Sequence, residues 1–338
     1  MKYKVGMYGG SFNPLHLGHV NDIIVASNQC EKLYVVLAIS DNKKEIDEKI
    51  RYKWLMNITN DMENVEVIKI YDESKSKDNT NWTKGRDEVI KQTGNIDVVF
   101  AGDDYKDKNI WEQLYPNSKI LYLSRNEINI SSTIIRNNLF EYYDYLPKCV
   151  QQEYIKKVCV IGTESCGKST LVRNLAKYFN TSYVEEMGRF VCEDAGGIDN
   201  MTPDDYYKIL FRHKEEERIK LKDANKVLLI DTDSLITLFY YSLSYKDTNE
   251  YNKNFQLLAE QISSLNNYDL YLFLETDVPF IKDITRSNGE NREKDNEYLK
   301  NILKRNNISY VVINGDYQER YENSKKEIIK LINKRKEI

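Results

Sequence analysis

Two histidines three residues apart, His16 and His19, follow paired glycines near the start of the chain. Paired glycines let a backbone pass close to a phosphate. If a helix begins near residue 17, both imidazoles face one ligand, and the helix N–H groups add donors for a triphosphate. Nucleotidyl transfer needs only such groups, because charge grows on phosphate oxygens without a covalent intermediate. We therefore predict that His16 and His19 are catalytic and that nucleotide is bound by Gly9, Gly10, Ser11 and Phe12.

A second phosphate-binding pattern, G-x-x-x-x-G-K-[ST], is present without departure from Gly162 to Ser169. An apolar strand-like segment precedes it and an amphipathic helix-like segment follows, as the pattern requires. Backbone N–H groups of such a loop cradle phosphates, the lysine neutralises the β and γ oxygens, and the hydroxyl ligates Mg²⁺. We predict phosphoryl transfer from ATP, with Lys168 catalytic and Ser169 a magnesium ligand. The predicted phosphate-binding residues are Gly162, Glu164, Ser165, Cys166, Gly167, Lys168, Ser169 and Thr170.

An aspartate pair, Asp231 and Asp233, follows the apolar segment 227–230. Carboxylates at the end of such a strand hold Mg²⁺ in phosphoryl-transfer enzymes, so we predict that Asp231 binds the metal and Asp233 contacts the substrate. A sugar hydroxyl that attacks phosphorus must also lose its proton to a nearby carboxylate. Glu186 and Asp231 are equal candidates for that base.

Other polar residues extend the second predicted site. Glu185 and Arg189 flank Glu186 and are predicted to bind substrate. Arg286 and Arg292 lie in a polar stretch typical of a lid whose arginines close over the transferring phosphoryl group. An ordinary charged loop is the alternative for that stretch.

The acceptor in the first site is indicated by two residues. Trp82 suits stacking on a pyridine or other flat ring, although a tryptophan in the core or at the rim explains it equally. Asp103 follows the strand-like segment 97–101, where ligands bind in open α/β sheets, and turn chemistry is the alternative. Both are predicted substrate-binding residues.

Strand-like and helix-like segments alternate along the whole chain, which predicts α/β domains with parallel sheets. Pro147 is expected to stop a helix-like segment over residues 134–143 and so to mark the boundary. We predict two doubly wound domains, a Rossmann-like nucleotidyltransferase over residues 1–147 and a P-loop kinase over residues 155–338. The expected strands are residues 3–8, 32–38, 65–70, 97–101, 120–123, 157–161, 182–184, 227–230, 270–274 and 310–313.

The composition, with 41% hydrophobic and 30% charged residues, is that of a soluble globular protein. A net charge of −4 predicts no nucleic-acid partner. Five cysteines without a CxxC pair favour a reducing compartment over a disulfide framework or a zinc site. Without a leader pattern or a long apolar run, we expect a cytoplasmic protein with no membrane insertion. No pattern indicates an oligomeric state.

Residues Ile130 to Arg136 resemble the ISxTxxR element of nucleotidyltransferases, and His16 to His19 resemble their HxGH element. In that superfamily the later element opens a helix beside the bound phosphates. The resemblance implies that Ser132 and Thr133 bind phosphates and that Arg136 is a catalytic residue that grips the β- and γ-phosphates.

The two halves together resemble the NadR-type family, which fuses a nicotinamide-nucleotide adenylyltransferase to a ribosylnicotinamide kinase. The resemblance covers nearly all of residues 3–332 and extends to the stretch Asn314 to Arg320. It implies that the second domain converts ribosylnicotinamide and ATP to NMN and ADP, with Mg²⁺. The first domain would then convert NMN and ATP to NAD and pyrophosphate. Some family members carry an N-terminal DNA-binding domain, whereas here the catalytic strand begins at Lys2, so we expect no direct DNA binding.

Two alternatives stay open. The same two ATP-dependent steps would serve another acceptor, such as flavin or pantetheine phosphate, although the kinase half of a flavin enzyme is not expected to be a P-loop domain. The acceptor is settled by which base-bearing ribonucleoside is consumed. A different class of protein is a nicotinamide-nucleotide sensor that binds without turnover, and ATP-dependent turnover would exclude it.

Overall fold

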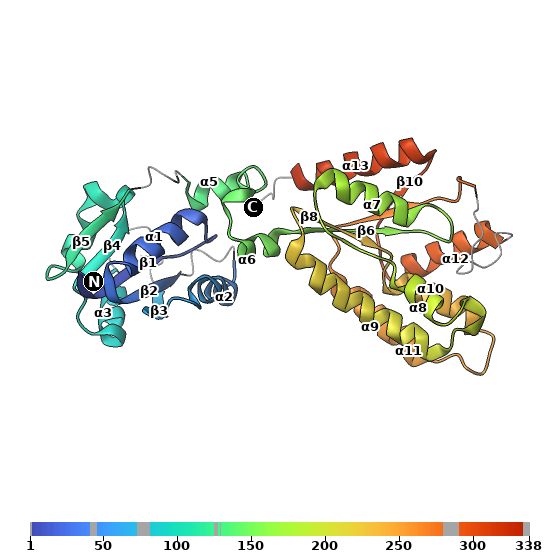
Figure 1. Ribbon diagram of the computed structural model, residues 1–338, viewed down its shortest axis with the longest axis horizontal. Helices are drawn as coiled ribbons and strands as arrows, with labels where there is room; N and C mark the ends of the chain where they lie inside the picture. Colours follow the sequence, from blue (N-terminus) through green and yellow to red (C-terminus); the bar gives the residue numbers. More distant parts are fainter. Residues whose placement is uncertain are drawn as a thin grey trace. The chain divides into compact units, whose positions relative to one another are not determined.

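The computed structural model describes residues 2–40, 46–72, 82–124, 128, 130–279 and 291–333. The chain divides into two compact units, Met1–Glu153 and Tyr154–Ile338. Each unit is built around its own five-stranded sheet, and every strand pair is parallel (Figure 1). In the described part of the chain, no helix has the combination of length and apolar character that crossing a bilayer requires.

The sheet of the first unit has the strand order β3-β2-β1-β4-β5. The central strand β1 pairs with β2 on one side and β4 on the other. Strands β2 and β3 are therefore added on one side of β1 and strands β4 and β5 on the other, so the strand order reverses at β1. Open α/β sheets bind ligands at such a switch point. Its elements are β1 (Tyr3–Gly10), α1 (Leu17–Ser27), β2 (Cys30–Ser40), α2 (Glu48–Thr59), β3 (Val65–Asp72), α3 (Trp82–Thr93), β4 (Val98–Gly102), α4 (Ile110–Leu114), β5 (Lys119–Leu123), α5 (Ser132–Asn137) and α6 (Lys148–Gln151).

The sheet of the second unit has the order β10-β9-β6-β8-β7, again with its first strand in the centre. Helices α7 and α13 cover one face of this sheet, and α9, α10 and α11 lie on the other (Figure 1). Its elements are β6 (Lys156–Ile161), α7 (Lys168–Phe179), β7 (Tyr183–Val184), α8 (Met187–Asp194), α9 (Pro203–Lys220), β8 (Val227–Asp231), α10 (Ser234–Tyr245), α11 (Lys253–Asn266), β9 (Leu270–Leu274), α12 (Arg292–Arg305), β10 (Val311–Ile313) and α13 (Tyr317–Asn333).

Local sequence explains why these elements form. Strands β4 and β8, each next to the central strand of its sheet, are buried at every position and apolar except for Asp231 at the end of β8, as expected of parallel strands covered on both faces. Helix α9 begins with a capping box, in which Thr202 and Asp205 satisfy each other's backbone N–H groups. Pro203 occupies the first helical position between them, where its missing N–H costs nothing.

The fold class and all ten predicted strands are confirmed. One predicted helix is wrong: the segment 134–143 forms only the short α5, which ends at Asn137, and a separate 3-10 turn at Tyr143–Tyr145. Asn138 caps α5, since asparagine competes for backbone hydrogen bonds and disfavours helix interiors. Pro147 does not stop a helix but precedes α6, where a missing N–H costs nothing.

Candidate active sites

The two histidines of the first unit lie against each other at the start of α1. His16 is the N-cap residue, and its Nδ1 accepts a hydrogen bond from the His19 N–H at 3.4 Å. The imidazole rings are stacked, with centroids 3.7 Å apart and an interplanar angle of 21°. The stacking needs a glycine between them, because a Cβ at Gly18 would lie 3.0 Å from the His16 ring. The structure thus brings both predicted histidines to one place at the end of the β1–α1 loop.

The loop before these histidines contains the other predicted residues. Gly9 and Gly10 are the last residues of β1, and Ser11 follows them. Phe12 is 1% exposed and has a φ of 47°, and the centroids of its ring and the His19 ring are 5.0 Å apart in an edge-to-face arrangement. Phe12 therefore supports the imidazole from inside the unit through its side chain, so only its backbone remains for a nucleotide.

The ISxTxxR element docks directly onto this loop. Ser132 Oγ donates to the Pro14 carbonyl at 2.9 Å, and Arg136 donates to the Asn13 carbonyl and, at 3.1 Å, to Thr133 Oγ1. The hydroxyl group that caps α5 belongs to Ser131, a residue that our prediction did not include. Two motifs more than one hundred residues apart in sequence therefore form one structure.

Sequence reasoning missed Arg51, which also binds this loop. Arg51 lies on α2 with 2% of its surface exposed, and its Nη1 donates to the Ser11 carbonyl at 2.7 Å. No motif surrounds Arg51, and its neighbours read as an ordinary amphipathic helix. Only its burial and its hydrogen bond to the loop distinguish Arg51 from its neighbours on α2.

Trp82 belongs to a cluster of aromatic side chains beside β1. Its ring is 5.8 Å from that of Trp111 and 6.3 Å from that of Tyr105, in edge-on or tilted geometry. Trp111 lies 4.0 Å from the position of a Cβ on Gly9, at the end of β1. Asp103 is half-buried directly after β4, at the carboxyl edge of the sheet. Both predicted acceptor residues thus lie at the edge where the phosphate loop begins.

The phosphate loop of the second unit forms one wall of a cavity of about 210 Å³. The opposite wall comes from α8, α9, α10 and the turn before α9. The loop contributes the predicted residues Glu164, Ser165, Cys166, Gly167, Lys168, Ser169 and Thr170, while Gly162 begins the loop outside the lining.

Lys168 is buried inside this loop. Its Nζ donates to the Thr163 carbonyl at 2.8 Å and lies 4.0 Å from Cys166 Sγ. Burial lowers the pKa of Lys168, but the surrounding anionic groups, among them Glu186 and Asp231, raise the pKa overall. The lysine therefore stays charged and available to bind phosphate oxygens.

Asp231 and Glu186 form an acidic pair next to the loop. Asp231 is 2% exposed, and burial together with the charge of Glu186 raises its pKa to about 7. Lys168 and a hydrogen bond from Ser169 act in the opposite direction. Oδ1 of Asp231 is buried and has no hydrogen-bond partner in the described part of the chain. Glu186 lines the main cavity, and both carboxylates line a smaller one beside it.

Asp233, a predicted substrate contact, lies in the interior of the second unit, where both its carboxylate oxygens accept hydrogen bonds from the protein. Asp233 is 1% exposed, and its Oδ1 accepts from the N–H groups of Leu235 and Ile236 at 3.0 and 3.1 Å, so it caps α10. Its Oδ2 accepts from Tyr271 at 3.1 Å. Burial raises the pKa of Asp233 to about 6. Both oxygens serve the fold, because a free helix N-terminus must be satisfied inside the protein.

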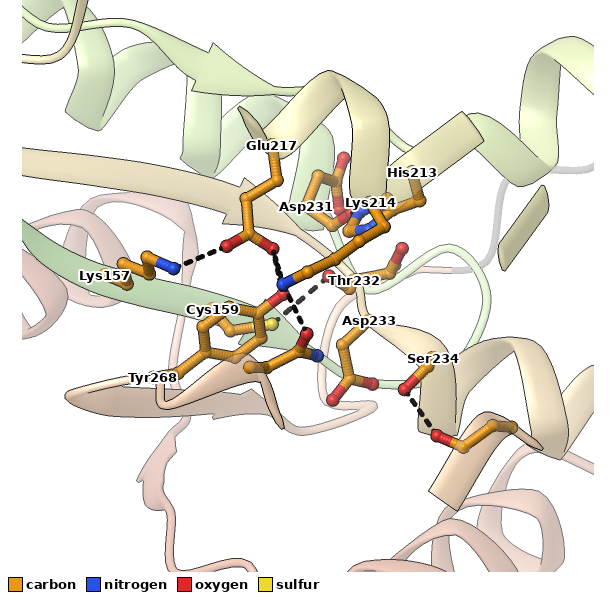
Figure 2. A network of polar contacts seen from close by, with 12 residues as sticks. Lys157, Cys159, His213, Lys214, Glu217, Asp231, Thr232, Asp233, Ser234 and Tyr268 are labelled. Carbon is orange, nitrogen blue, oxygen red and sulfur yellow. Dashed lines mark hydrogen bonds and ion pairs between the residues drawn. The ribbon is translucent and has the colours of Figure 1, made fainter. Parts of the chain in front are cut away.

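A buried polar network connects α9 to strands β6 and β8 (Figure 2). Glu217 accepts from Lys157 at 2.7 Å, from Lys214 at 3.2 Å and from Tyr268 at 3.0 Å. Burial alone would raise the pKa of Glu217, but the two lysines keep it below its ordinary value. One turn earlier on α9, His213 Nε2 lies 3.3 Å from the Asp231 carbonyl. The network joins the helix that lines the cavity to the strand that carries Asp231.

The remaining predicted residues are distributed around the cavity. Arg189 lines both cavities, and Glu185 lines only the smaller one. Arg292 Nη1 donates to the Val278 carbonyl at 2.9 Å and is not among the residues lining either cavity. Arg286 lies outside the described residues.

Sequence reasoning missed the wall that faces the phosphate loop. It consists of side chains from three helices and their connections, and no motif links them. These residues are Cys192, Ile198, Met201, Tyr206, Ile209 and Tyr240.

Family models match both units. Residues 7–138 match a model described as cytidylyltransferase-like, and residues 157–320 match a model described as an AAA domain. Each match lies within one of the two units, and each includes the phosphate loop of that unit.

Some relatives match nearly the whole chain. The trifunctional NAD biosynthesis/regulator protein NadR of Escherichia coli (strain K12) is 28% identical over 95% of this chain and 81% of its own length. Solved structures of NadR in complex with NR and with NAD and AMP-PNP superpose with TM-scores of 0.78 and 0.77. Each of these structures is 22% identical to this chain, and each match spans 98% of this chain and 96% of the solved chain. The phosphopantetheine adenylyltransferase of Mycoplasma mycoides subsp. mycoides SC is 31% identical over 41% of this chain and 98% of its own.

Proposed function

Because the chain belongs to the NadR-type family, we propose that it makes NAD in two ATP-dependent steps. The second unit phosphorylates ribosylnicotinamide to NMN, and the first unit transfers AMP from ATP to NMN, giving NAD and pyrophosphate. The observation that carries this proposal is the presence of two complete phosphate loops, each at the carboxyl edge of its own sheet, in a chain that matches NadR over nearly its full length.

In the second unit we assign the general base to Glu186. It lines the main cavity together with Arg189, whereas Asp231 lines only the smaller cavity beside Ser169. A carboxylate at the cavity wall orients the ribose hydroxyl and accepts its proton as oxygen attacks the γ-phosphorus. The bond from the γ-phosphorus to the bridging oxygen breaks, and ADP leaves. Lys168 neutralises charge on the β- and γ-oxygens during the transfer.

Magnesium fits the residues beside this base. The buried Oδ1 of Asp231 without a hydrogen-bond partner and the hydroxyl of Ser169 border the same small cavity. Mg²⁺ takes one or two oxygens from a protein and the others from phosphates and water. The described residues contain no group of three or more His, Cys, Asp and Glu that would hold a metal alone. When bound, the ion neutralises charge on the phosphates.

In the first unit we assign charge stabilisation to His16 and His19. A phosphate oxygen of NMN attacks the α-phosphorus of ATP, and the bond to the β-phosphate breaks to release pyrophosphate. The stacked imidazoles and the start of α1 supply donors for the oxygens on which charge grows. The acceptor phosphate is already ionised, so this step requires no base.

We place the nicotinamide ring of NMN against the aromatic cluster of Trp82, Tyr105 and Trp111. Trp111 lies beside Gly9 at the end of β1, where the phosphate loop begins, and the other two rings contact Trp111, so an acceptor stacked on the cluster would direct its phosphate toward the loop. Asp103, after the neighbouring strand β4, is the polar residue that we assign to the same acceptor.

Incubation with ribosylnicotinamide, ATP and Mg²⁺, followed by chromatography of the nicotinamide species over time, tests this function. We expect NMN to appear first and then to give way to NAD. Accumulation of NMN without NAD would support the kinase activity of the second unit but would reject NMN as the acceptor of the first unit. Unchanged ribosylnicotinamide in the presence of ATP turnover would reject the nicotinamide assignment itself.

A second acceptor for the first unit is phosphopantetheine, and the similarity to phosphopantetheine adenylyltransferase favours testing it. If this acceptor is used, the same chromatography with phosphopantetheine and ATP would show dephospho-coenzyme A and pyrophosphate. We expect kcat/KM for NMN to exceed that for phosphopantetheine, because the relatives that match the whole chain are NAD biosynthesis proteins.

A further inference from the structure

Two arginines that take no part in the reactions above are almost completely buried, one in each unit. Arg320 of α13 and Arg51 of α2 each expose 2% of their surface. A buried guanidinium is costly unless all its N–H groups have partners. In both cases one partner is a backbone carbonyl inside a phosphate loop.

Arg320 joins three separate segments of the second unit. Its Nη1 donates to the Cys166 carbonyl at 2.5 Å, its Nη2 to the Glu275 carbonyl at 2.8 Å and its Nε to the Gly315 carbonyl at 2.9 Å. It also forms an ion pair with Asp277, and Asp277 Oδ2 accepts from the Gly315 N–H at 2.5 Å. The phosphate loop is therefore held to the end of β9 and to the turn after β10 by one side chain.

Arg51 has the corresponding place in the first unit. Its Nη1 donates to the Ser11 carbonyl at 2.7 Å, and its Nε donates to the Ile46 carbonyl at 3.1 Å. Arg51 comes from a helix after β2, so its contact also connects the loop after β1 to a neighbouring part of the sheet edge.

These contacts fix the direction of one peptide group in each phosphate loop. A trans peptide is planar, and its C=O and N–H point in opposite directions. The Cys166 carbonyl shares a peptide plane with the Gly167 N–H, so holding that carbonyl on Arg320 directs the N–H away from Arg320. Gly167 lines the cavity and has a φ of 87°, which a residue with a Cβ would adopt only with strain. In the first unit, the Ser11 carbonyl shares its plane with the Phe12 N–H.

We propose that Arg320 and Arg51 are positioning residues, each of which orients one backbone N–H of its phosphate loop toward ATP. This inference rests on the proposed function, since it assumes that ATP binds at both loops. Neither guanidinium needs to touch the nucleotide, so neither arginine is a catalytic residue in this inference. It also predicts that their effects are confined to the unit in which each lies.

The test uses the full chain with Arg320→Lys, Arg320→Met, Arg51→Lys and Arg51→Met. Lysine keeps the charge but not the planar fork, and methionine removes both. Lys330→Met on α13 and Lys53→Met on α2 are matched controls, because both lysines are exposed on the same helices. The measurements are the KM for ATP, the KM for the acceptor and kcat of each activity, with thermal unfolding of every variant.

We expect both Arg320 variants to raise the kinase KM for ATP by roughly tenfold, because the Gly167 N–H is no longer held in place and its hydrogen bond to a charged phosphate oxygen is lost. The KM for ribosylnicotinamide and the adenylyltransferase constants should stay within twofold of those of the unmodified protein. The Arg51 variants should show the reverse pattern. Lysine should not rescue either activity.

Three results would overturn the inference. A lower kcat with an unchanged KM for ATP would mean that the arginine only sets the fraction of folded protein. Equal loss of both activities would show that the effect is not local. Loss of the cooperative unfolding transition in the lysine variants would make the role structural. Absence of both activities in the unmodified protein would instead reject the proposed function, whatever the variants do.

Discussion

The two phosphate loops of this chain are built by different means, although both follow the central strand of a parallel sheet. The loop of the first unit has its histidines stacked at the start of α1, and side chains from α2 and α5 hold its carbonyls. The loop of the second unit surrounds a buried lysine and has two carboxylates beside it. The difference corresponds to the acceptors, because a ribose hydroxyl must lose a proton whereas a phosphate arrives ionised.

The comparison also separates the electrostatics of the two sites. In the second unit, burial and the neighbouring Glu186 raise the pKa of Asp231 into the neutral range. A site that must bind a metal ion and remove a proton gathers acidic groups, and their mutual repulsion makes it sensitive to pH. The first unit has aromatic side chains at the corresponding edge, which suits recognition of a flat ring.

Substitution of Lys168 should separate the two activities most strongly. We expect Lys168→Ala to lower kinase kcat/KM by about 10³-fold, because the charge that stabilises the transferring phosphoryl group is lost. NMN should still be converted to NAD at the original rate. Lys177→Ala, an exposed lysine on the same helix, is the control. Loss of both activities in folded protein would show that the two sites are coupled.

Substitution of His19 should have the opposite effect. We expect His19→Ala to lower adenylyl transfer by about 10²-fold, since one stabilising group for the pyrophosphate-releasing step is removed. NMN should then accumulate from ribosylnicotinamide. Ile24→Ala, an exposed position on the same helix, should leave NAD formation unchanged. NAD production at the original rate in the His19 variant would remove this residue from its assigned role.

Acid should weaken the kinase through its metal site. Asp231, whose pKa is about 7, is ionised above that value and protonated below it, and only the ionised form binds Mg²⁺ well. The apparent KM for Mg²⁺ should therefore rise by roughly tenfold for each pH unit below 7. Burial still raises this pKa in Glu186→Gln, but the charge of Glu186 no longer does, so weaker Mg²⁺ binding should begin at a lower pH. Because Glu186 is the assigned base, this variant is compared by Mg²⁺-dependent binding of ATP and not by turnover. The same KM at pH 6 and pH 8 would contradict the assignment.

Substitution of Asp233 should change stability and leave substrate binding unchanged. Asp233→Ala removes the cap of α10 and should lower the free energy of unfolding of the second unit by about 1–2 kcal/mol. Asp233→Asn keeps an acceptor for the helix and should cost less. The KM for ribosylnicotinamide should not change in the folded variants. A selective rise in that KM would instead support the predicted substrate contact of Asp233.

Most of the fold was predictable because its evidence is local. The alternation of apolar strands with amphipathic helices is visible in windows of ten to twenty residues, and all ten strands occur where the pattern places them. The helix over residues 134–143 was mispredicted because Asn138 ends α5. The sequence around Asp233 is ambiguous for a similar reason, since a carboxylate after a strand suits both a substrate and a helix cap, and in the structure Asp233 caps α10.

The sequence by itself determined the two phosphate loops, their order and the α/β class, because a loop that binds phosphate through its own backbone is encoded in adjacent residues. Only the tertiary structure decided which side chains support those loops. Arg51 and Arg320 reach them from helices 40 and 154 residues away, and Tyr206 and Tyr240 face the second loop from two different helices. Such contacts depend on how the chain packs, and packing brings distant residues together without any pattern in their local sequence.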